Sequence, residues 1–574
     1  MQRKLIVLLI ILAGSMAAPA LQAADTETAQ DQYSLWIGSH YTDFSDYAKK
    51  VGEYNLGNSE LLPEFRFSHY ALREGGVFRL DAHYYDDQNI LGRLQTAAGD
   101  RFSGLFQFRS LTKQTGQDNL SNLEVREWLS TVPGGKIVTH EILDPNADYN
   151  TNRQELLGRI SVLLSRSNNL RLMAAHRSIL ERGTEQSTSS SHCFSCHITS
   201  QGVDVDRRTH QFETGVQGDF GKYTVGYQFG YRHFSSKEPD PYAVYDRAVN
   251  PVNGTSGPEF DSRLVYADTV AAYGAAPKTE KLSHKVRVKG AVGKGYFTGT
   301  AGFTHVTNKR VDLSTDALSG SATYSVPLAA HTRMIARGSA VRQRSDDPFI
   351  DLPTYRAGRP GPQVSFDYTR WSSLDRSDLK GSLELIRKLN PRLTMSLLAG
   401  YNRIARTNYP DAGTSYTTGT FTGQAKFRYR PASQTNMALS YRFRKSSDPF
   451  ANLNGLFEAR GRDVLRPLVP GYGFVFYFQR EDLKYQNVST LPTDYHEAEL
   501  TASWTPSAKS TVTLLLKGIY DKNGDLDSLD VNHKAFQPNL NLTLVPNPKW
   551  TLAAGYTYNY DRSKQPVAVA LFDG

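Results

Sequence analysis

The strongest constraint in this sequence is a two-residue alternation of apolar and polar side chains that recurs across residues 33–560. In residues 223–233 the odd positions read Tyr, Val, Tyr, Phe, Tyr and His, and the even positions between them read Thr, Gly, Gln, Gly and Arg. The same pattern returns at residues 393–401, 437–443 and 550–560, each time shortly after a turn-like Asn or Pro. A period of two places alternate side chains on opposite faces of a strand, so the pattern predicts an all-β chain of hairpins.

Both a soluble β-sandwich and a membrane β-barrel use such an alternation. The inward positions of a sandwich are mostly Val, Ile and Leu, and its units contain about 100 residues. Here the apolar positions are rich in aromatic residues, with 32 Tyr and 27 Phe in the chain, and the other positions hold Gly, Ser, Thr, Arg and Lys. Outer-membrane barrels need this combination because lipid-facing residues are apolar, with aromatic girdles, while lumen residues are polar. We therefore expect a large antiparallel transmembrane β-barrel, with stacked soluble β-domains as the alternative.

The N-terminus resembles a secretory signal peptide. Residues 1–4 are basic, residues 5–13 form a short apolar core, and residues 17–24 are mostly small. This arrangement predicts a signal peptide at residues 1–23 that is removed on export. No later run of about 18 apolar residues could form a transmembrane helix.

The length of the mature chain predicts a wide barrel. At roughly 10 residues per strand plus turns and loops, residues 24–574 correspond to about 20–26 strands. A barrel of that size has an interior wide enough for a folded insert. The net charge of +9 favours anionic cargo or an acidic insert, although solvated loop charges explain most of it equally well.

The two cysteines of the chain lie in the segment Cys193-Phe194-Ser195-Cys196-His197, inside a polar stretch that we expect to form a loop at about 179–206. Cys-x-x-Cys-His is the attachment sequence of c-type haem. In that chemistry the thiols of Cys193 and Cys196 bond to the haem vinyl groups, and the imidazole of His197 ligates the iron. The motif therefore predicts one covalent haem c as cofactor.

Other chemistry remains open for the same segment. The two thiols could form a disulfide or a dithiol switch in an oxidising compartment, or bind zinc together with His192 and His197. A distal iron ligand cannot be read from the pattern. The nearest candidates in the sequence are His176, His210, His192 and Met173, although a single His in a strand is more often a lumen or girdle residue.

A signal peptide, a Tyr-rich barrel, strands such as residues 169–177 and an isolated Cys-x-x-Cys pair together resemble the MtrB/PioB family of decahaem-cytochrome-associated outer-membrane porins. The resemblance implies a barrel that acts as a sheath for a multihaem cytochrome, which carries electrons between periplasm and cell surface. It also implies periplasmic and surface multihaem c-type cytochromes as partners, within the outer-membrane lipid of a Gram-negative cell. No nucleic-acid partner is expected.

The sequence departs from the pattern of that family at two places. The Cys-x-x-Cys pair sits well inside the chain and is followed by His197. The C-terminus ends in Asp573-Gly574 rather than on a strand with a final aromatic residue, which leaves open that the barrel is incomplete there.

Functional expectations follow from these features. One haem cannot carry electrons across a hydrocarbon core about 30 Å thick, so the chain of redox centres must come from a partner protein. A haem in this chain would then be a centre where electrons enter, leave or are sensed. Nucleotide-binding, hydrolase and metalloprotease motifs are absent from the sequence, so we expect no catalytic residues and no enzyme. The alternatives are a diffusion or substrate-specific porin with an incidental disulfide, and a soluble secreted β-repeat haem protein.

Overall fold

A computed structural model of the chain describes residues 30–42, 60–73, 75–119, 137–192, 195–245, 269–350, 355–356, 363–364, 368–369, 371–409, 412–450, 491–525 and 531–565. The predicted signal peptide and Cys193 lie outside the described residues. Within these ranges no helix has the length and apolar character needed to cross a bilayer.

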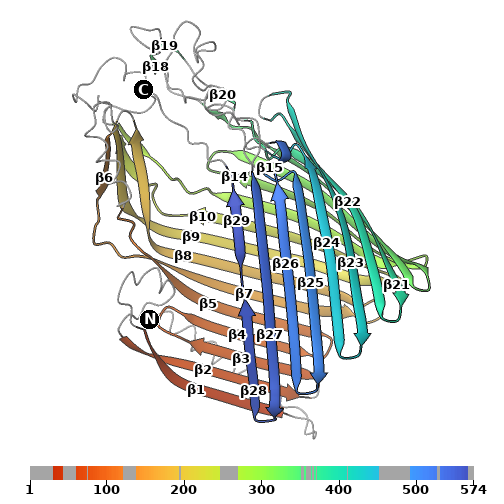
Figure 1. Cartoon of the computed structure of the whole chain (residues 1–574). Helices are drawn as coiled ribbons and strands as arrows, with labels where there is room; N and C mark the ends of the chain where they lie inside the picture. Colours follow the sequence, from red (N-terminus) through yellow and green to blue (C-terminus); the bar gives the residue numbers. More distant parts are fainter. Residues whose placement is uncertain are drawn as a thin grey trace.

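One sheet of 23 strands dominates the structure (Figure 1). The predicted all-β class is confirmed, and the strand number falls within the expected range. The strands of this sheet are β1 (Gln30–Thr42), β2 (Glu60–Arg73), β3 (Gly76–Tyr84), β4 (Ile90–Ala98), β5 (Phe102–Thr115), β6 (Ile137–Ile142), β7 (Tyr149–Ser165), β8 (Leu170–His192), β9 (Ser195–Phe220), β10 (Tyr223–Ser236), β13 (Thr279–Val292), β14 (Gly295–Asn308), β15 (Leu313–Ala329), β16 (Thr332–Ser345), β21 (Arg376–Asn390), β22 (Leu393–Thr407), β23 (Ser415–Ala432), β24 (Thr435–Ser447), β25 (Asp494–Ser507), β26 (Ser510–Lys522), β27 (Asn532–Asn547), β28 (Trp550–Thr557) and β29 (Tyr560–Lys564).

Three small two-stranded sheets complete the described secondary structure. They pair β11 (Tyr242–Tyr245) with β12 (Thr269–Ala272), β17 (Phe349–Ile350) with β20 (Tyr368–Thr369), and β18 (Tyr355–Arg356) with β19 (Gln363–Val364). All of them lie in connections between strands of the large sheet.

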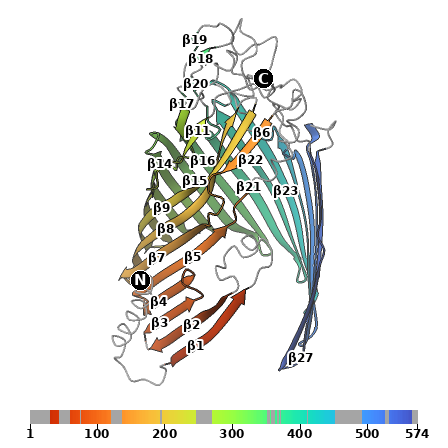
Figure 2. The same ribbon diagram turned by 90° about the vertical axis from the view of Figure 1, so that its left-hand side faces the viewer.

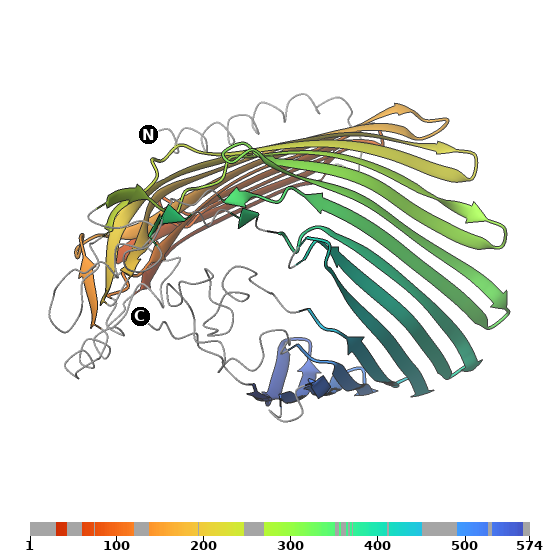
Figure 3. The same ribbon diagram turned by 90° about the horizontal axis from the view of Figure 1, so that it is seen from above.

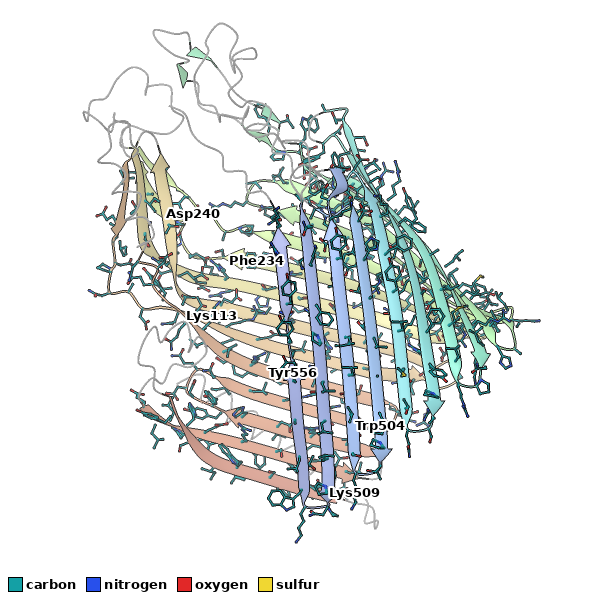
Figure 4. All side chains as sticks on the ribbon, viewed as in Figure 1. Lys113, Phe234, Asp240, Trp504, Lys509 and Tyr556 are labelled. Atoms are coloured by element: carbon teal, nitrogen blue, oxygen red, sulfur yellow. The ribbon has the colours of Figure 1, made fainter. Side chains whose placement is uncertain are left out.

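The connections differ in length at the two ends of the large sheet. At one end, which we call the short-turn end, hairpins close within a few residues, as where Gly221 and Lys222 alone join β9 to β10. Gly221 has a φ of 60°, a left-handed conformation that glycine adopts without steric cost. The opposite, long-loop end holds the long connections, and Figure 4 labels Lys509 at the short-turn end and Asp240 at the long-loop end. Short turns on one side and long loops on the other are typical of outer-membrane barrels.

The sheet curls around an interior, with its first and last strands on opposite sides of it (Figures 2 and 3). Both β1 and β28 begin at the short-turn end and run toward the long-loop end. Among the described residues, β1 pairs with β2, and β28 and β29 both pair with β27. No described pairing joins the two edges of the sheet.

The register carries the alternation of the sequence from strand to strand. Between β22 and β23, Tyr401 pairs with Phe421 and Met395 with Phe427, while the intervening Ser396 pairs with Lys426. Successive pairings continue both sets across the sheet, from Tyr33 on β1 to Tyr556 on β28. We call the two resulting surfaces the apolar face and the polar face.

The apolar residues form a band of limited height on the apolar face. In β22 the band covers about nine residues, Leu393–Tyr401, close to the roughly 9–11 residues with which a tilted strand crosses a bilayer. Aromatic residues mark both borders, as outer-membrane barrels require. They are Phe220, Tyr223, Phe297, Tyr324, Tyr429, Trp504 and Trp550 toward the short-turn end, and Tyr231, Phe303, Tyr401, Phe421, Phe443, Tyr520 and Phe536 toward the long-loop end.

The expectation of a loop at about 179–206 is wrong. β8 continues to His192 and β9 resumes at Ser195, so these strands reach 23 and 26 residues and pair with each other up to His192 and Cys196. The segment extends past the apolar band, so neither face needs apolar side chains and the alternation disappears. Backbone pairing between β8 and β9 continues through the extension without the alternation.

Gly183 of β8 tests how tightly this extension packs. It has a φ of 151°, and a Cβ atom there would overlap the carbonyl oxygen of Asn150 in β7 and lie 2.8 Å from the Cα of Thr151. We expect Gly183→Ala to destabilise the protein by more than about 1 kcal/mol, because alanine is strained at positive φ. Tryptophan fluorescence during urea unfolding measures the loss.

The matched control for this substitution is Gly320→Ala in β15, where a Cβ would meet no atom within 4 Å. An equal effect of the two substitutions would contradict the described packing of β7 against β8.

Candidate functional site

The polar face carries most of the charged side chains of the described strands. Two groups of its arginines differ in their partners. The arginines of one group, on β7, β8 and β9, have carboxylate partners, and those of the other group, on β4, β7 and β13, have none in the described part of the chain.

We call the first group the paired tier. Arg153 donates to Glu181 at 2.6 Å and to Glu155 at 3.5 Å, and Arg177 donates to the other oxygen of Glu155 at 2.7 Å. Nearer still to the long-loop end, the guanidinium of Arg207 donates to both carboxylate oxygens of Glu185, at 3.2 and 3.0 Å. Charge is therefore balanced locally at this level of the sheet.

The second group lines a cavity of about 550 Å³ on the polar face, which we call the arginine hollow. Its lining includes Arg93 of β4, Arg159 of β7 and Arg287 of β13. None of the three has a hydrogen-bond or ion-pair partner among the described residues. Small side chains make the space between them, because Ala97, Ser103, Ala175 and Gly215 also line the hollow.

β13 extends this positive surface. Its polar-face positions include Lys281, Lys285, Arg287 and Lys289 and no carboxylate. The positions opposite them on β14 are neutral, with Gly302 facing Lys285 and Thr300 facing Arg287. This part of the polar face therefore favours anions over cations.

The described part of the Cys-x-x-Cys-His motif lies at the outer end of the β8–β9 pair, which we call the tip. Cys196 and His197 belong to β9, where the register pairs Cys196 with His192 and, in parallel, with Val138 of β6. About 15 residues separate His197 from Phe212, which borders the apolar band, and at about 3.3 Å per residue this is roughly 50 Å of strand. The motif therefore lies on the long-loop side of the sheet, well beyond the band.

The structure places three of the candidate distal ligands, His176, His210 and Met173, far from that tip, whereas the fourth, His192, pairs with Cys196 there. His176 stacks on Phe212 with ring centroids 4.3 Å apart, and its ring lies parallel to that of His210 at 5.9 Å. His210 is about 13 residues from His197 along β9, or roughly 40 Å. Met173 is farther away, since it pairs with Gly215. The two histidines meet each other at the border of the apolar band, far from the Cys193 segment.

The side chains of Cys196, His197 and His192 lie outside what the structure describes, so haem attachment remains a prediction, as do the disulfide and zinc alternatives. Elsewhere in the described ranges, no group of three or more His, Cys, Asp or Glu is arranged to hold a metal ion.

A buried polar cluster anchors the base of the extended hairpin. The carboxylate of Asp144 accepts hydrogen bonds from the hydroxyl of Tyr149 at 2.8 Å and from the backbone N–H of Gly202 at 2.6 Å. Tyr149 and Ser200 are fully buried, and Ser200 accepts a hydrogen bond from Gln186 at 2.6 Å. Burial, together with the bond to Asp144, raises the pKa of the Tyr149 phenol, so it remains a donor.

Asp144→Ala tests whether this cluster holds the hairpin in place. The substitution leaves the Tyr149 hydroxyl and the Gly202 N–H without their acceptor, at a cost of about 1–3 kcal/mol for each buried group. We expect amide hydrogen exchange in residues 195–206 to accelerate by about tenfold or more.

Asp100→Ala is the control, since Asp100 forms only an exposed pair with Arg166 at the short-turn end and such pairs contribute little. Unchanged exchange in Asp144→Ala would show that backbone pairing alone holds the extension.

The arginine hollow is the feature that inspection of the sequence missed. Arg93, Arg159 and Arg287 each occupy a polar position of an alternating strand, where a charge is unremarkable. The available signal was the run of small residues at neighbouring polar positions, but their proximity depends on the register of seven strands.

No protein-family model matches the chain, and no curated protein matches it. Several solved structures are similar in shape. The unliganded ferric citrate transporter FecA shares 12% identity and a TM-score of 0.43, over 93% of this chain and 71% of that chain. The copper transporter OprC shares 10% identity and a TM-score of 0.46, over 93% and 74% of the two chains. The FrpB iron transporter from Neisseria meningitidis shares 10% identity and a TM-score of 0.47, over 97% and 81%. Similarities of this size support no statement about the cargo of this chain.

Proposed function

We propose that the chain is the wall of an outer-membrane β-barrel that surrounds a passage through the membrane. The observation that carries this proposal is the register, which is regular through the apolar band and keeps one face apolar and the other polar from β1 to β28. The apolar face, with its two aromatic borders, contacts lipid, and the polar face lines the passage.

The two ends of the sheet give the orientation. Short turns lie on the periplasmic side of outer-membrane barrels and long loops outside the cell. The start of β1 at the short-turn end agrees with this arrangement, because an exported chain enters the membrane from the periplasm. The β8–β9 extension then projects at the cell surface.

The passage favours negatively charged cargo. Unpaired arginines and the lysines of β13 lie on the polar face at the height of the apolar band, where a permeating solute would meet them. A fixed positive potential raises the local concentration of anions and lowers that of cations. The role is transport, and the polar face supplies charge and hydrogen bonds rather than a catalytic group.

A second candidate function is a sheath for a multihaem c-type cytochrome, which the sequence resemblance suggests. The position of Cys196 and His197 on the surface-exposed hairpin favours it, because a covalent haem there would stand where a surface cytochrome can approach. Periplasmic and surface cytochromes would then supply the chain of redox centres, since a single haem cannot span the membrane. Of the candidate distal ligands, His192 is the one whose backbone lies at that tip, and its side chain is outside what the structure describes.

Cysteine labelling tests the orientation. In a Cys193→Ser/Cys196→Ser background, we expect Lys237→Cys, which follows β10 at the long-loop end, to react with a membrane-impermeant maleimide on intact cells. Lys509→Cys, in the turn between β25 and β26, should react only after the outer membrane is opened. The reverse labelling pattern would show that the barrel has the opposite orientation. Equal labelling of the two variants, with the protein in the soluble fraction, would contradict membrane insertion.

Purification separates the two functions. For a porin, liposomes containing the detergent-extracted protein should release small anions faster than cations of equal size. For a sheath, a red multihaem protein should co-purify from the outer membrane, and a denaturing gel stained for covalent haem shows whether the chain itself carries one. Liposomes that release no ions, together with purified protein that carries no red multihaem partner, would count against both functions.

A further inference from the structure

We infer that the arginine hollow is a binding site for small organic anions that carry two or more carboxylate or phosphate groups, held chiefly by Arg93 and Arg159. The inference deepens the proposed function, because it names a substrate class for the passage.

The two arginines are placed to share one ligand. Arg93 on β4 and Arg159 on β7 lie on either side of β5. The register pairs Leu105 of β5 with Arg159 and with Gln95, so Arg93 is offset from Arg159 by two residues along β4. Two strand spacings of about 4.8 Å and an offset of two residues of about 3.3 Å place their Cα atoms roughly 12 Å apart. Two long side chains can meet at an anion between them. Guanidinium groups suit this task because each presents a fork of donors that matches a carboxylate or a phosphate.

No carboxylate of the described chain neutralises these arginines. The residues directly opposite Arg159 in the register are Leu105 and Ala175. Asp81 stands opposite Arg93, but both of its oxygens accept hydrogen bonds from Arg79, at 2.8 and 3.2 Å. Asp81 therefore bonds within its own strand, and Arg93 lacks the carboxylate contact seen in the paired tier.

The carboxylate that lines the hollow is also engaged. One oxygen of Glu213 accepts from Gln211 at 2.6 Å and the other from Gln228 at 2.9 Å. These amides are neutral, so Glu213 keeps its negative charge, and it stands in line with Arg159 across Ala175 without a direct ion pair. Glu213 limits how many negative charges a ligand can bring close to β9, which favours ligands that place their acidic groups toward β4 and β7.

The size of the hollow fits a small ligand. Its volume of about 550 Å³ lies within the roughly 300–1,000 Å³ of small-molecule sites. Arg287 lies at the far side of the hollow, roughly 23 Å from Arg159 if the strand spacing and rise are counted as above. It is too distant to share a small anion with Arg159, so it provides a separate contact farther along the passage.

Equilibrium dialysis of the full-length, detergent-solubilised protein tests the site, with pyrophosphate and tricarballylate as probes and acetate as the singly charged comparison. We expect both probes to bind more tightly than acetate. Arg93→Gln/Arg159→Gln should weaken binding of the probes by about a hundredfold, since each of the two lost charge-assisted contacts is worth roughly tenfold. Arg159→Lys keeps the charge but not the fork, and should give an intermediate affinity.

The control is Arg428→Gln on β23, an exposed arginine of the same face that does not line the hollow. It removes one positive charge and should leave probe binding unchanged. Because Arg93, Arg159 and Arg428 are all exposed, we expect the variants to fold, and far-ultraviolet circular dichroism verifies it.

Failure of both probes to bind, or equal weakening of probe binding by Arg428→Gln and by the double substitution, would overturn the inference. If one probe binds and the other does not, the ligand class narrows to phosphates or to carboxylates. A wrong anion-site inference can be distinguished from a wrong barrel proposal, because the labelling pattern of Lys237→Cys and Lys509→Cys does not depend on anion binding.

Discussion

Backbone hydrogen bonding between neighbouring strands is the constraint on which the rest of this structure depends. Inside a bilayer no water satisfies a free N–H or C=O, so every wall strand must pair along its length. Side chains alternate with a period of two, so a slip of one residue would turn a strand's apolar side chains to the wrong face. The register shifts seen here, such as those between Tyr429 and Ala432 and between Trp504 and Ser507, lie beside short turns and leave the middle of the band regular.

Alternation was a reliable guide only where lipid imposes it. In β22 and β23 the apolar positions of the sequence are the ones that the register aligns on one face. The β8–β9 extension lies beyond the apolar band, so its sequence needs no alternation, and its many Ser and Thr residues make it resemble a loop. The sequence pattern did not predict β6 either, because its parallel pairing with β9 joins residues about 58 positions apart. Local patterns cannot report a pairing of that kind.

The candidate site could be predicted from the sequence even less than the strands could. Arg153 and Arg159 occupy equivalent polar positions of β7, six residues apart, yet one bridges two carboxylates and the other has none within the described residues. The difference lies on the neighbouring strand, where the register places Glu181 opposite Arg153 and Ala175 opposite Arg159. Net charge indicated an anionic preference for the whole chain, but only the paired strands show where that charge is uncompensated. His176 and His210 illustrate the converse, because the length of β8 and β9 places them far from His192 and Cys196.

The shared direction of β1 and β28 has a consequence for how the wall could become a ring. If these two edges met directly, their seam would be a parallel ladder in an otherwise antiparallel wall, with evenly spaced, slanted bonds and slightly lower stability per residue. An antiparallel seam instead demands an odd number of intervening strands, whether from this polypeptide or from another. The relative direction of the two strands at the seam thus determines the parity of the barrel. A parallel seam closes a ring with an odd number of strands, and an antiparallel seam closes one with an even number.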